Sequence, residues 1–158
     1  MDDGINKKDG ELLQLVTFST GDEEFGVDIL KVQEIILPMA ITKVPKAPEF
    51  VEGVINLRGK VIPVIDLRRR FGLKPKAQDK YTRIIVIEIN QMIVGFVVDS
   101  ISEVLRIPAS TVEPPPAVVA GLESEYISGV GKLEDRLLIL LDLDRLLSRE
   151  DQEALQGL

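Results

Sequence analysis

The fold is best indicated by residues 51–67, which read VEGVINLRGKVIPVIDL. Two apolar runs rich in Val and Ile flank a short polar segment that contains Arg58 and Gly59. β-Branched side chains pack well on strands, and a glycine adopts the positive φ that a tight hairpin turn requires. The pattern predicts a β-hairpin whose turn holds Arg58 outside the core.

The second half of the chain repeats this hairpin. Residues 126–143 read YISGVGKLEDRLLILLDL and align without a gap on residues 50–67, so that Gly53 and Asp66 recur as Gly129 and Asp142. Further upstream, the pair Val27-Asp28 resembles Val98-Asp99. Chance similarity between two β-rich hairpins is the alternative, but a gapless match favours an internal duplication.

Each half has the order hairpin, proline-rich connection, hairpin, short helix. A half of roughly 60 residues is small for an independent core. Short strands at close spacing with little helix between them favour small antiparallel barrels. We therefore expect a mainly β fold of two five-stranded, SH3-like barrel subdomains packed together, with short helices and a junction that buries apolar faces of both.

The expected boundaries follow the repeat. Residues 1–11 are polar and read as a disordered tail. Residues 12–148 form one domain, with subdomain 1 at about 12–73 and subdomain 2 at about 80–148. Residues 149–158 read as a fraying helical tail, and the C-terminal segment is expected to pack on subdomain 1.

Composition narrows the classes of function. The chain of 158 residues has a net charge of −7 and no Cys or His, which disfavours nucleic-acid binding and excludes thiolate metal sites and histidine-based catalysis. Its basic residues are scattered except for Arg68, Arg69 and Arg70, which read as a solvated helix face. No apolar run approaches the ~20 residues that span a bilayer, and no signal-peptide pattern is present. We expect a cytoplasmic protein without cofactor or metal.

Two features of the sequence resemble catalytic sites, and neither is a good match. The Gly-Lys pair at Gly59 faintly resembles a phosphate-binding loop, but its spacing is wrong and a strand follows it. Asp66 and Asp142 would form a carboxylate dyad only if a deep pocket held both. A helix cap explains each Asp separately, so an acid-dependent hydrolase is the disfavoured alternative.

Binding remains as the class of function. Arg58 has the chemistry of an interface hot spot, or it is an ordinary exposed turn charge, and the sequence leaves both open. Val32, Glu34 and Ile36 alternate as in a half-buried strand or a contact surface. The apolar segment 114–122 reads as a cover over the core or a docking surface.

Several segments resemble the CheW family of chemotaxis coupling proteins. They are GDEEFGVDILKVQEI, VEGVINLRGKVIPVIDLRRRFG, VGFVVDSISEVLRI and YISGVGKLEDRLLILLDLDRLL, within residues 12–147. The resemblance implies two five-stranded barrels and a non-enzymatic adaptor that couples transmembrane chemoreceptors to the histidine kinase CheA in signalling arrays. The alternative is a helix-binding scaffold in another two-component pathway.

The resemblance also implies sites and partners. The cytoplasmic helical tip of a chemoreceptor would bind a groove between the barrels, at Val32, Glu34, Arg58, Val94, Gly95, Val98 and Ile101. The regulatory domain of CheA would bind at Gly53, Gly59, Pro116 and Val118. Other copies of the chain are further expected partners within arrays at the membrane, without membrane insertion and without nucleic acid.

Overall fold

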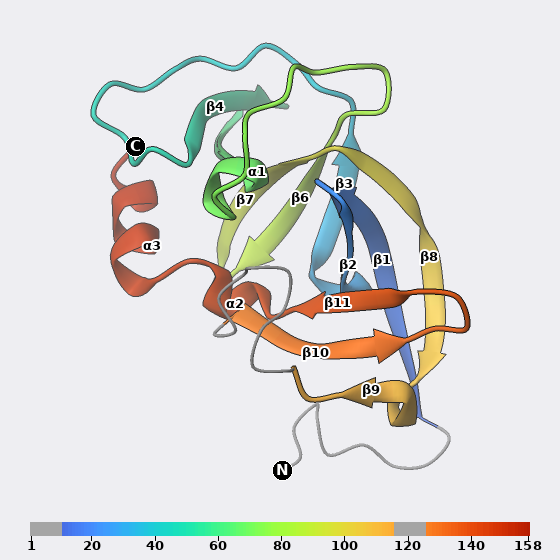
Figure 1. Cartoon of the computed structure of the whole chain (residues 1–158). Coiled ribbons are helices and arrows are strands. Elements are labelled where there is room, and N and C mark those ends of the chain that lie inside the picture. The colour runs from blue at the N-terminus through green and yellow to red at the C-terminus, as the bar shows by residue number, and fades with distance from the viewer. Residues whose placement is uncertain (1–10, 116–125) are drawn as a thin grey trace.

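The structure, a computed structural model, describes residues 11–115 and 126–158, and Figure 1 shows them as two β-sheets joined by short helices. The strands of the first half are β1 (Leu12–Thr20), β2 (Glu23–Asp28), β3 (Val32–Ile36), β4 (Val51–Leu57) and β5 (Lys60–Asp66). Those of the second half are β6 (Arg83–Ile89), β7 (Met92–Val98), β8 (Ser100–Pro108), β9 (Val112–Glu113), β10 (Ile127–Lys132) and β11 (Leu137–Leu141). The helices are η1 (Ile29–Lys31), α1 (Leu67–Arg70), η2 (Ala109–Thr111), α2 (Leu143–Leu146) and α3 (Arg149–Gln156).

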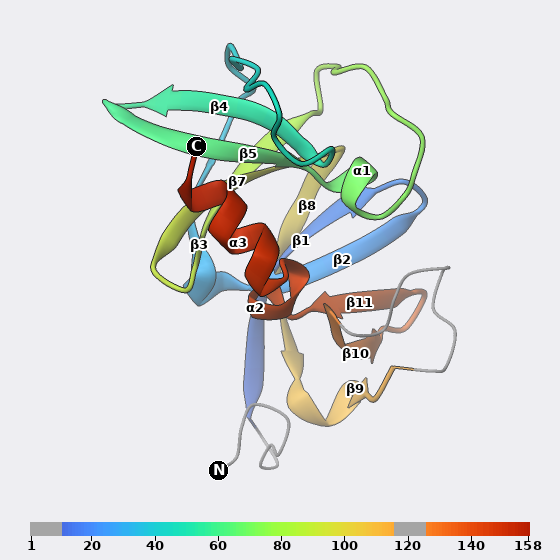
Figure 2. The ribbon, with the colours of Figure 1, turned by 90° about the vertical axis from the view of Figure 1, so that its left-hand side faces the viewer.

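The strands form a six-stranded sheet in the order β8-β1-β2-β11-β10-β9 and a five-stranded sheet in the order β3-β6-β7-β5-β4. Figure 2 shows the two sheets packed together, with α3 in front of them, on the side that faces the viewer. The prediction of a mainly β fold of two packed, five-stranded barrel-like units with short helices is confirmed, except that one of the two sheets has six strands.

The subdomain boundaries expected near residues 73 and 80 are wrong, because the two halves exchange hairpins. The first hairpin, β1–β2, pairs with β8 and β11 of the second half. The hairpin β6–β7 pairs in turn with β3 and β5 of the first half. Both copies of the repeat offer similar edges, so local sequence does not decide which copy a hairpin joins.

The duplication itself is visible in matching backbone details. The pairing register shifts between Val51 and Gly53 in one hairpin and between Ile127 and Gly129 in the other. The caps also match: Asp66 accepts from Arg68 N–H at the start of α1, and Asp142 accepts from Asp144 N–H at the start of α2. The capping prediction for both aspartates is confirmed.

Gly53 brings the two edges of the five-stranded sheet together. Thr42, which follows β3, exchanges backbone hydrogen bonds of 2.9 and 2.8 Å with Val54 of β4. At Gly53, where φ is +153°, a Cβ would lie 2.3 Å from the Thr42 carbonyl oxygen. Only glycine permits this approach.

Gly129 has the same role in the six-stranded sheet. The short strand β9 lies against β10 there, and a Cβ on Gly129 would lie 2.6 Å from Val112 Cγ1 and 3.1 Å from the Glu113 carbonyl oxygen. The glycine that recurs in the duplicated sequence is therefore the residue that allows a third segment to pack against each hairpin.

Pro63 shows how the closure accommodates a proline inside a sheet. A proline within a strand ordinarily marks a sheet edge or a bulge, but β5 lies between β7 and β4. Pro63 pairs with Val54, whose N–H and carbonyl groups are both engaged by Thr42. The missing N–H of Pro63 therefore leaves no ladder bond unmade at this pair.

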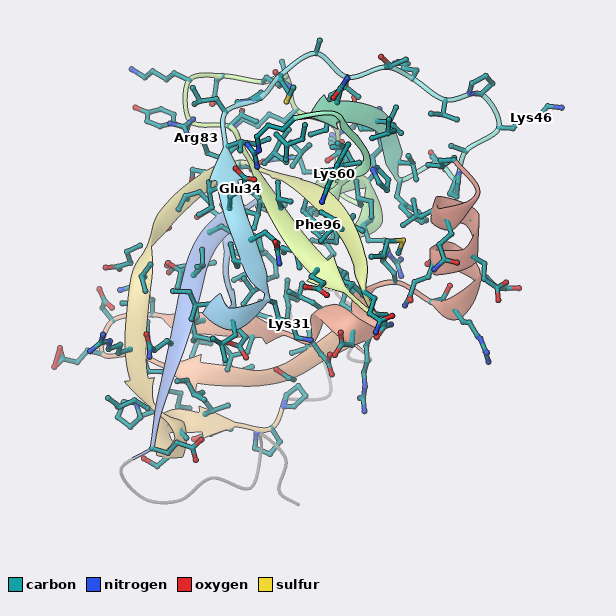
Figure 3. The ribbon with its side chains drawn as sticks, turned by 180° about the vertical axis from the view of Figure 1, so that it is seen from behind. Lys31, Glu34, Lys46, Lys60, Arg83 and Phe96 are labelled. Carbon is teal, nitrogen blue, oxygen red and sulfur yellow. The ribbon has the colours of Figure 1, made fainter. Side chains whose placement is uncertain are left out.

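The core consists of one large cluster that both sheets share and two smaller clusters, each within a single sheet. The shared cluster draws residues from both sheets and from the helices, including Phe18, Phe25, Phe96, Leu146 and Leu155, and Figure 3 labels Phe96 within it. Each sheet adds a smaller cluster of its own. This division confirms that the junction buries apolar faces from both units.

The arginine run 68–70 was expected to be a solvated helix face, which holds only for Arg69, the exposed member of the run. Arg68 and Arg70 are partly buried. The Arg70 guanidinium lies 5.5 Å from the ring centre of Phe50 and 5.4 Å from that of Tyr126. It also donates to the Leu146 carbonyl oxygen at 2.8 and 3.1 Å. Phe50 and Tyr126 are equivalent in the repeat, so Arg70 lies where the two copies meet.

The C-terminal helix was expected and is present as α3. Its Ser148 and Asp151 form a reciprocal capping box, and Leu155 is only 3% exposed. Gln152 accepts a hydrogen bond from the side chain of Asn90 in the β6–β7 turn. Residues 149–156 are thus packed on the domain as an integral helix. The expected tail, apart from Glu11, lies outside the described residues.

Candidate functional site

The β4–β5 hairpin presents Arg58 on a rigid two-residue turn. Arg58 and Gly59 have φ of +53° and +87°, and the flanking residues Leu57 and Lys60 pair with each other. Positive φ at both central positions is the geometry that matches the twist of a hairpin. The Asn56 side chain accepts from Gly59 N–H at 2.9 Å and fixes the turn.

Glu34 lies on β3, at the opposite edge of the same sheet. The register between β3 and β6 shifts between Val32 and Glu34, and such a bulge redirects the side chains that follow it. The Glu34 carboxylate forms an ion pair with the Arg58 guanidinium. Figure 3 shows Glu34 on the same side of the molecule as Lys60 of the hairpin.

This ion pair joins two of the residues that the family resemblance assigns to receptor binding. Arg58 is 68% exposed at its side chain and Glu34 is 32% exposed. Only one guanidinium nitrogen of Arg58 donates to a residue that the structure describes. The pair therefore pre-orients an arginine whose remaining donors face solvent.

The other predicted receptor-binding residues separate into two groups. Val32 and Ile101 are partly buried and pack against the shared core. Val94 is 0% and Val98 1% exposed, while Gly95 is buried with Ile84 Cγ2 only 2.9 Å from where its Cβ would lie. Direct contact of these last three residues with a partner is contradicted, since they lie inside the sheet packing.

The predicted kinase-binding residues also divide. Gly53 is buried and serves sheet closure, so its assignment as a contact residue is wrong. Gly59 is exposed at the hairpin tip, where an added Cβ would meet nothing within 4 Å. Pro116 and Val118 lie outside the described residues.

Sequence reasoning missed two exposed apolar side chains on β3 and β5, and a third in the residue that follows β3. Ile35 is 40% exposed, Leu37 66% and Val61 67%. Ile35 and Leu37 alternate with the predicted residues of β3, so a strand with two apolar faces was the available signal. Lys60 and Val61 also line an apolar groove of about 460 Å³ against Leu155 and Leu158 of the C-terminal segment.

A second, smaller hollow is polar and contains Asp66 but not Asp142. The carboxylate dyad therefore finds no common pocket here. Beside Asp66, the Arg68 guanidinium donates to both oxygens of Asp99 at 3.0 and 2.8 Å, and Gly21 N–H donates at 2.9 Å. Burial alone would raise the pKa of Asp99, but these donors outweigh it and hold the pKa below its ordinary value.

The described residues contain no group of three His, Cys, Asp or Glu side chains arranged to hold a metal ion. None of the helices within residues 11–115 and 126–158 is long and apolar enough to cross a membrane. The exposed features at this site are thus a pre-oriented ion pair and apolar side chains, which suit contact with another protein.

A family model for the CheW-like domain matches residues 14–151. The chain belongs to the CheW family. It is 42% identical to the chemotaxis protein CheW of Klebsiella aerogenes, over 93% of this chain and 90% of that protein. It is 39% identical to the Helicobacter pylori CheW over 93% and 89% of the two chains.

A solved CheW-family structure supports the fold. The crystal structure of the scaffolding protein TtCheW from Thermoanaerobacter tengcongensis superposes with a TM-score of 0.82 at 40% identity. The match covers 89% of this chain and 96% of the other. At this identity and coverage, the two CheW-family chains share one architecture.

Proposed function

We propose that this chain is a non-enzymatic chemotaxis adaptor that couples transmembrane chemoreceptors to the histidine kinase CheA within receptor arrays. Its membership of the CheW family supports this role, as does its likeness to a protein described as a scaffold. The observation that carries the proposal is the exposed, pre-oriented Arg58 on the β4–β5 hairpin.

The receptor-binding surface of this proposal consists of Val32, Glu34, Arg58 and Ile101. A receptor helix would place apolar side chains against the partly buried Val32 and Ile101. The free donors of Arg58 would bind a carboxylate or carbonyl group on that helix. The kinase regulatory domain would contact the exposed hairpin tip at Gly59. Such small interfaces gain strength from repetition in an array.

The first test is Arg58→Glu. Placing two carboxylates together should weaken binding to a purified chemoreceptor cytoplasmic tip by about tenfold or more, the scale of a lost interface arginine. Thermal unfolding should stay close to that of the parent chain, because the side chain is mostly exposed. Calorimetric titration of the receptor tip into each variant measures the change.

A charge swap separates the partner role from the internal pair. The double variant Arg58→Glu/Glu34→Arg restores the ion pair within the chain but reverses the charges offered to a partner. If Arg58 binds the receptor, affinity stays low in the double variant. Recovery of parental affinity would show that the pair only shapes the hairpin, and would remove the key support for the proposed surface.

A further inference from the structure

We propose that one end of the molecule is a basic docking face for an acidic segment of a protein partner, distinct from the surface around Arg58. The face consists of the connecting segments 37–50 and 72–82, with Lys43, Lys46, Lys74, Lys76 and Lys80. These five lysines are exposed.

The sequence charge is strongly divided. Residues 43–83 contain eleven Lys and Arg against four Asp and Glu, a net charge of +7. The rest of the chain contains eight against 22, a net charge of −14. The chain is acidic overall, but the middle of its sequence carries a net positive charge.

The fold gathers this region at one end. Figures 1 and 2, seen at right angles, both place the segments 37–50 and 72–82 at the upper end, with β9 at the opposite end. Figure 3 labels Lys46 at the outer limit of that upper end. The two connecting segments that carry the lysines thus lie toward one end of the molecule.

Most cations of this region make no ion pair with a residue that the structure describes. Ten of the basic residues among those described form ion pairs, including Lys76 with Asp79. The six cations within 43–83 that make no ion pair with a described residue are Lys43, Lys46, Lys60, Lys74, Lys80 and Arg83. Outside this region, Arg106 is the only described basic residue that makes no ion pair with another described residue.

The same two segments expose apolar and aromatic side chains. Leu37 is 66%, Met39 37%, Leu73 36% and Tyr81 58% exposed, and the Lys80 ammonium lies 5.3 Å from the Tyr81 ring centre. Tyr and Met are enriched in protein interfaces, where they supply contact area beside charged groups. Prolines 38, 45, 48 and 75 restrict these segments and reduce the entropy lost on binding.

The charge distribution favours a protein over a bilayer or a nucleic acid. Those are extended anionic surfaces, and they would also repel the remaining −14 wherever it came within a Debye length of about 8–10 Å. A narrow acidic segment need only contact the face itself. Complementary charge also steers its approach and makes the binding sensitive to salt.

The test uses a short fluorescein-labelled polyglutamate peptide, followed by fluorescence anisotropy at low and physiological salt. The face variant is Lys43→Glu/Lys46→Glu/Lys74→Glu/Lys80→Glu in the full chain. The matched control reverses four cations outside the face, of which Lys31 is partly buried and the others are exposed: Lys31→Glu/Lys132→Glu/Arg145→Glu/Arg149→Glu. Circular dichroism and thermal melting establish that both variants fold.

We expect the parent and control chains to bind the peptide, with affinity falling as salt rises, and the face variant to bind at least about tenfold more weakly. Equal weakening in both variants would overturn the proposal, since net charge alone would then govern binding. So would face-dependent co-sedimentation with phosphatidylglycerol vesicles without peptide binding. Salt-sensitive self-association that the face variant abolishes, again without peptide binding, would assign the face to a second copy instead.

Discussion

Arg70 and Arg58 lie in two regions that use the same side chain in opposite ways. Arg70 lies between the rings of Phe50 and Tyr126, with a carbonyl oxygen of its own chain as acceptor. Arg58 stands on a turn, 68% exposed, with one carboxylate beside it. The first arginine has its donors used by the fold, whereas the second has donors to spare. An arginine is therefore available for binding only where the fold leaves its guanidinium incompletely engaged.

The largest predicted loss of stability comes from a glycine substitution. It should distinguish Gly53 from Gly59, although both glycines have positive φ. In Gly53→Ala the new Cβ would collide with the Thr42 carbonyl group, so unfolding free energy should fall by about 3 kcal/mol or more. In Gly59→Ala the space is open, and strain alone should cost about 1 kcal/mol. Urea unfolding measures both, and equal losses would show that closure at Thr42 is not what restricts Gly53.

The next effect compares the arginines themselves. Arg70→Met should lower the unfolding free energy by about 3 kcal/mol, because two aromatic contacts and two charge-assisted hydrogen bonds disappear. Arg58→Met is the matched control. Because its side chain is mostly exposed, its cost should stay within about 0.5 kcal/mol. A similar loss in both variants would contradict the distinction between the junction and the hairpin tip.

A third effect concerns pH at the junction. The pKa of Asp99 is lowered by its donors despite burial, so its contribution to stability is complete above the ordinary Asp pKa of about 3.9 and is lost as pH falls toward the lowered value. Asp99→Asn should cost about 2 kcal/mol at neutral pH, and the difference from the parent chain should shrink in acid. Urea unfolding from pH 7 to pH 3 tests this, and a difference that does not depend on pH would contradict it.

The smallest effect on stability should be that of Arg58→Glu, whose large effect is expected on receptor binding alone. Thermal melting beside the receptor-tip titration gives both numbers for one variant. A melting temperature that falls as far as that of Arg70→Met would show that Arg58, like Arg70, mainly stabilises the fold.

Local sequence predicted the elements well. The hairpin at 51–67 follows from apolar runs about a turn, and both capping aspartates follow from their position before a short helix. The exposed position of Arg58 follows from the same hairpin. These features depend only on neighbours within a few residues, which is why one sequence suffices to find them.

Contacts between residues that are far apart in the sequence could not be predicted. The exchange of hairpins depends on which of two similar edges is nearer in space. The enclosure of Arg70 depends on Phe50 and Tyr126, which are distant in sequence and meet only when the sheets pack. Val94 and Val98 lie on the same face of β7 as Phe96, and all three belong to the shared core, so their burial depends on which face of the strand meets the other sheet.

The exchange of hairpins between the two halves also determines whether the chain can be cut into independent fragments. A cut in the α1–β6 connection would yield two fragments, and each would lack strands that its sheets require from the other. Neither piece should fold by itself, yet the two should recombine when mixed, as complementary parts of a split protein. Such a pair would report, by its reconstitution, any event that brings two fused partners together.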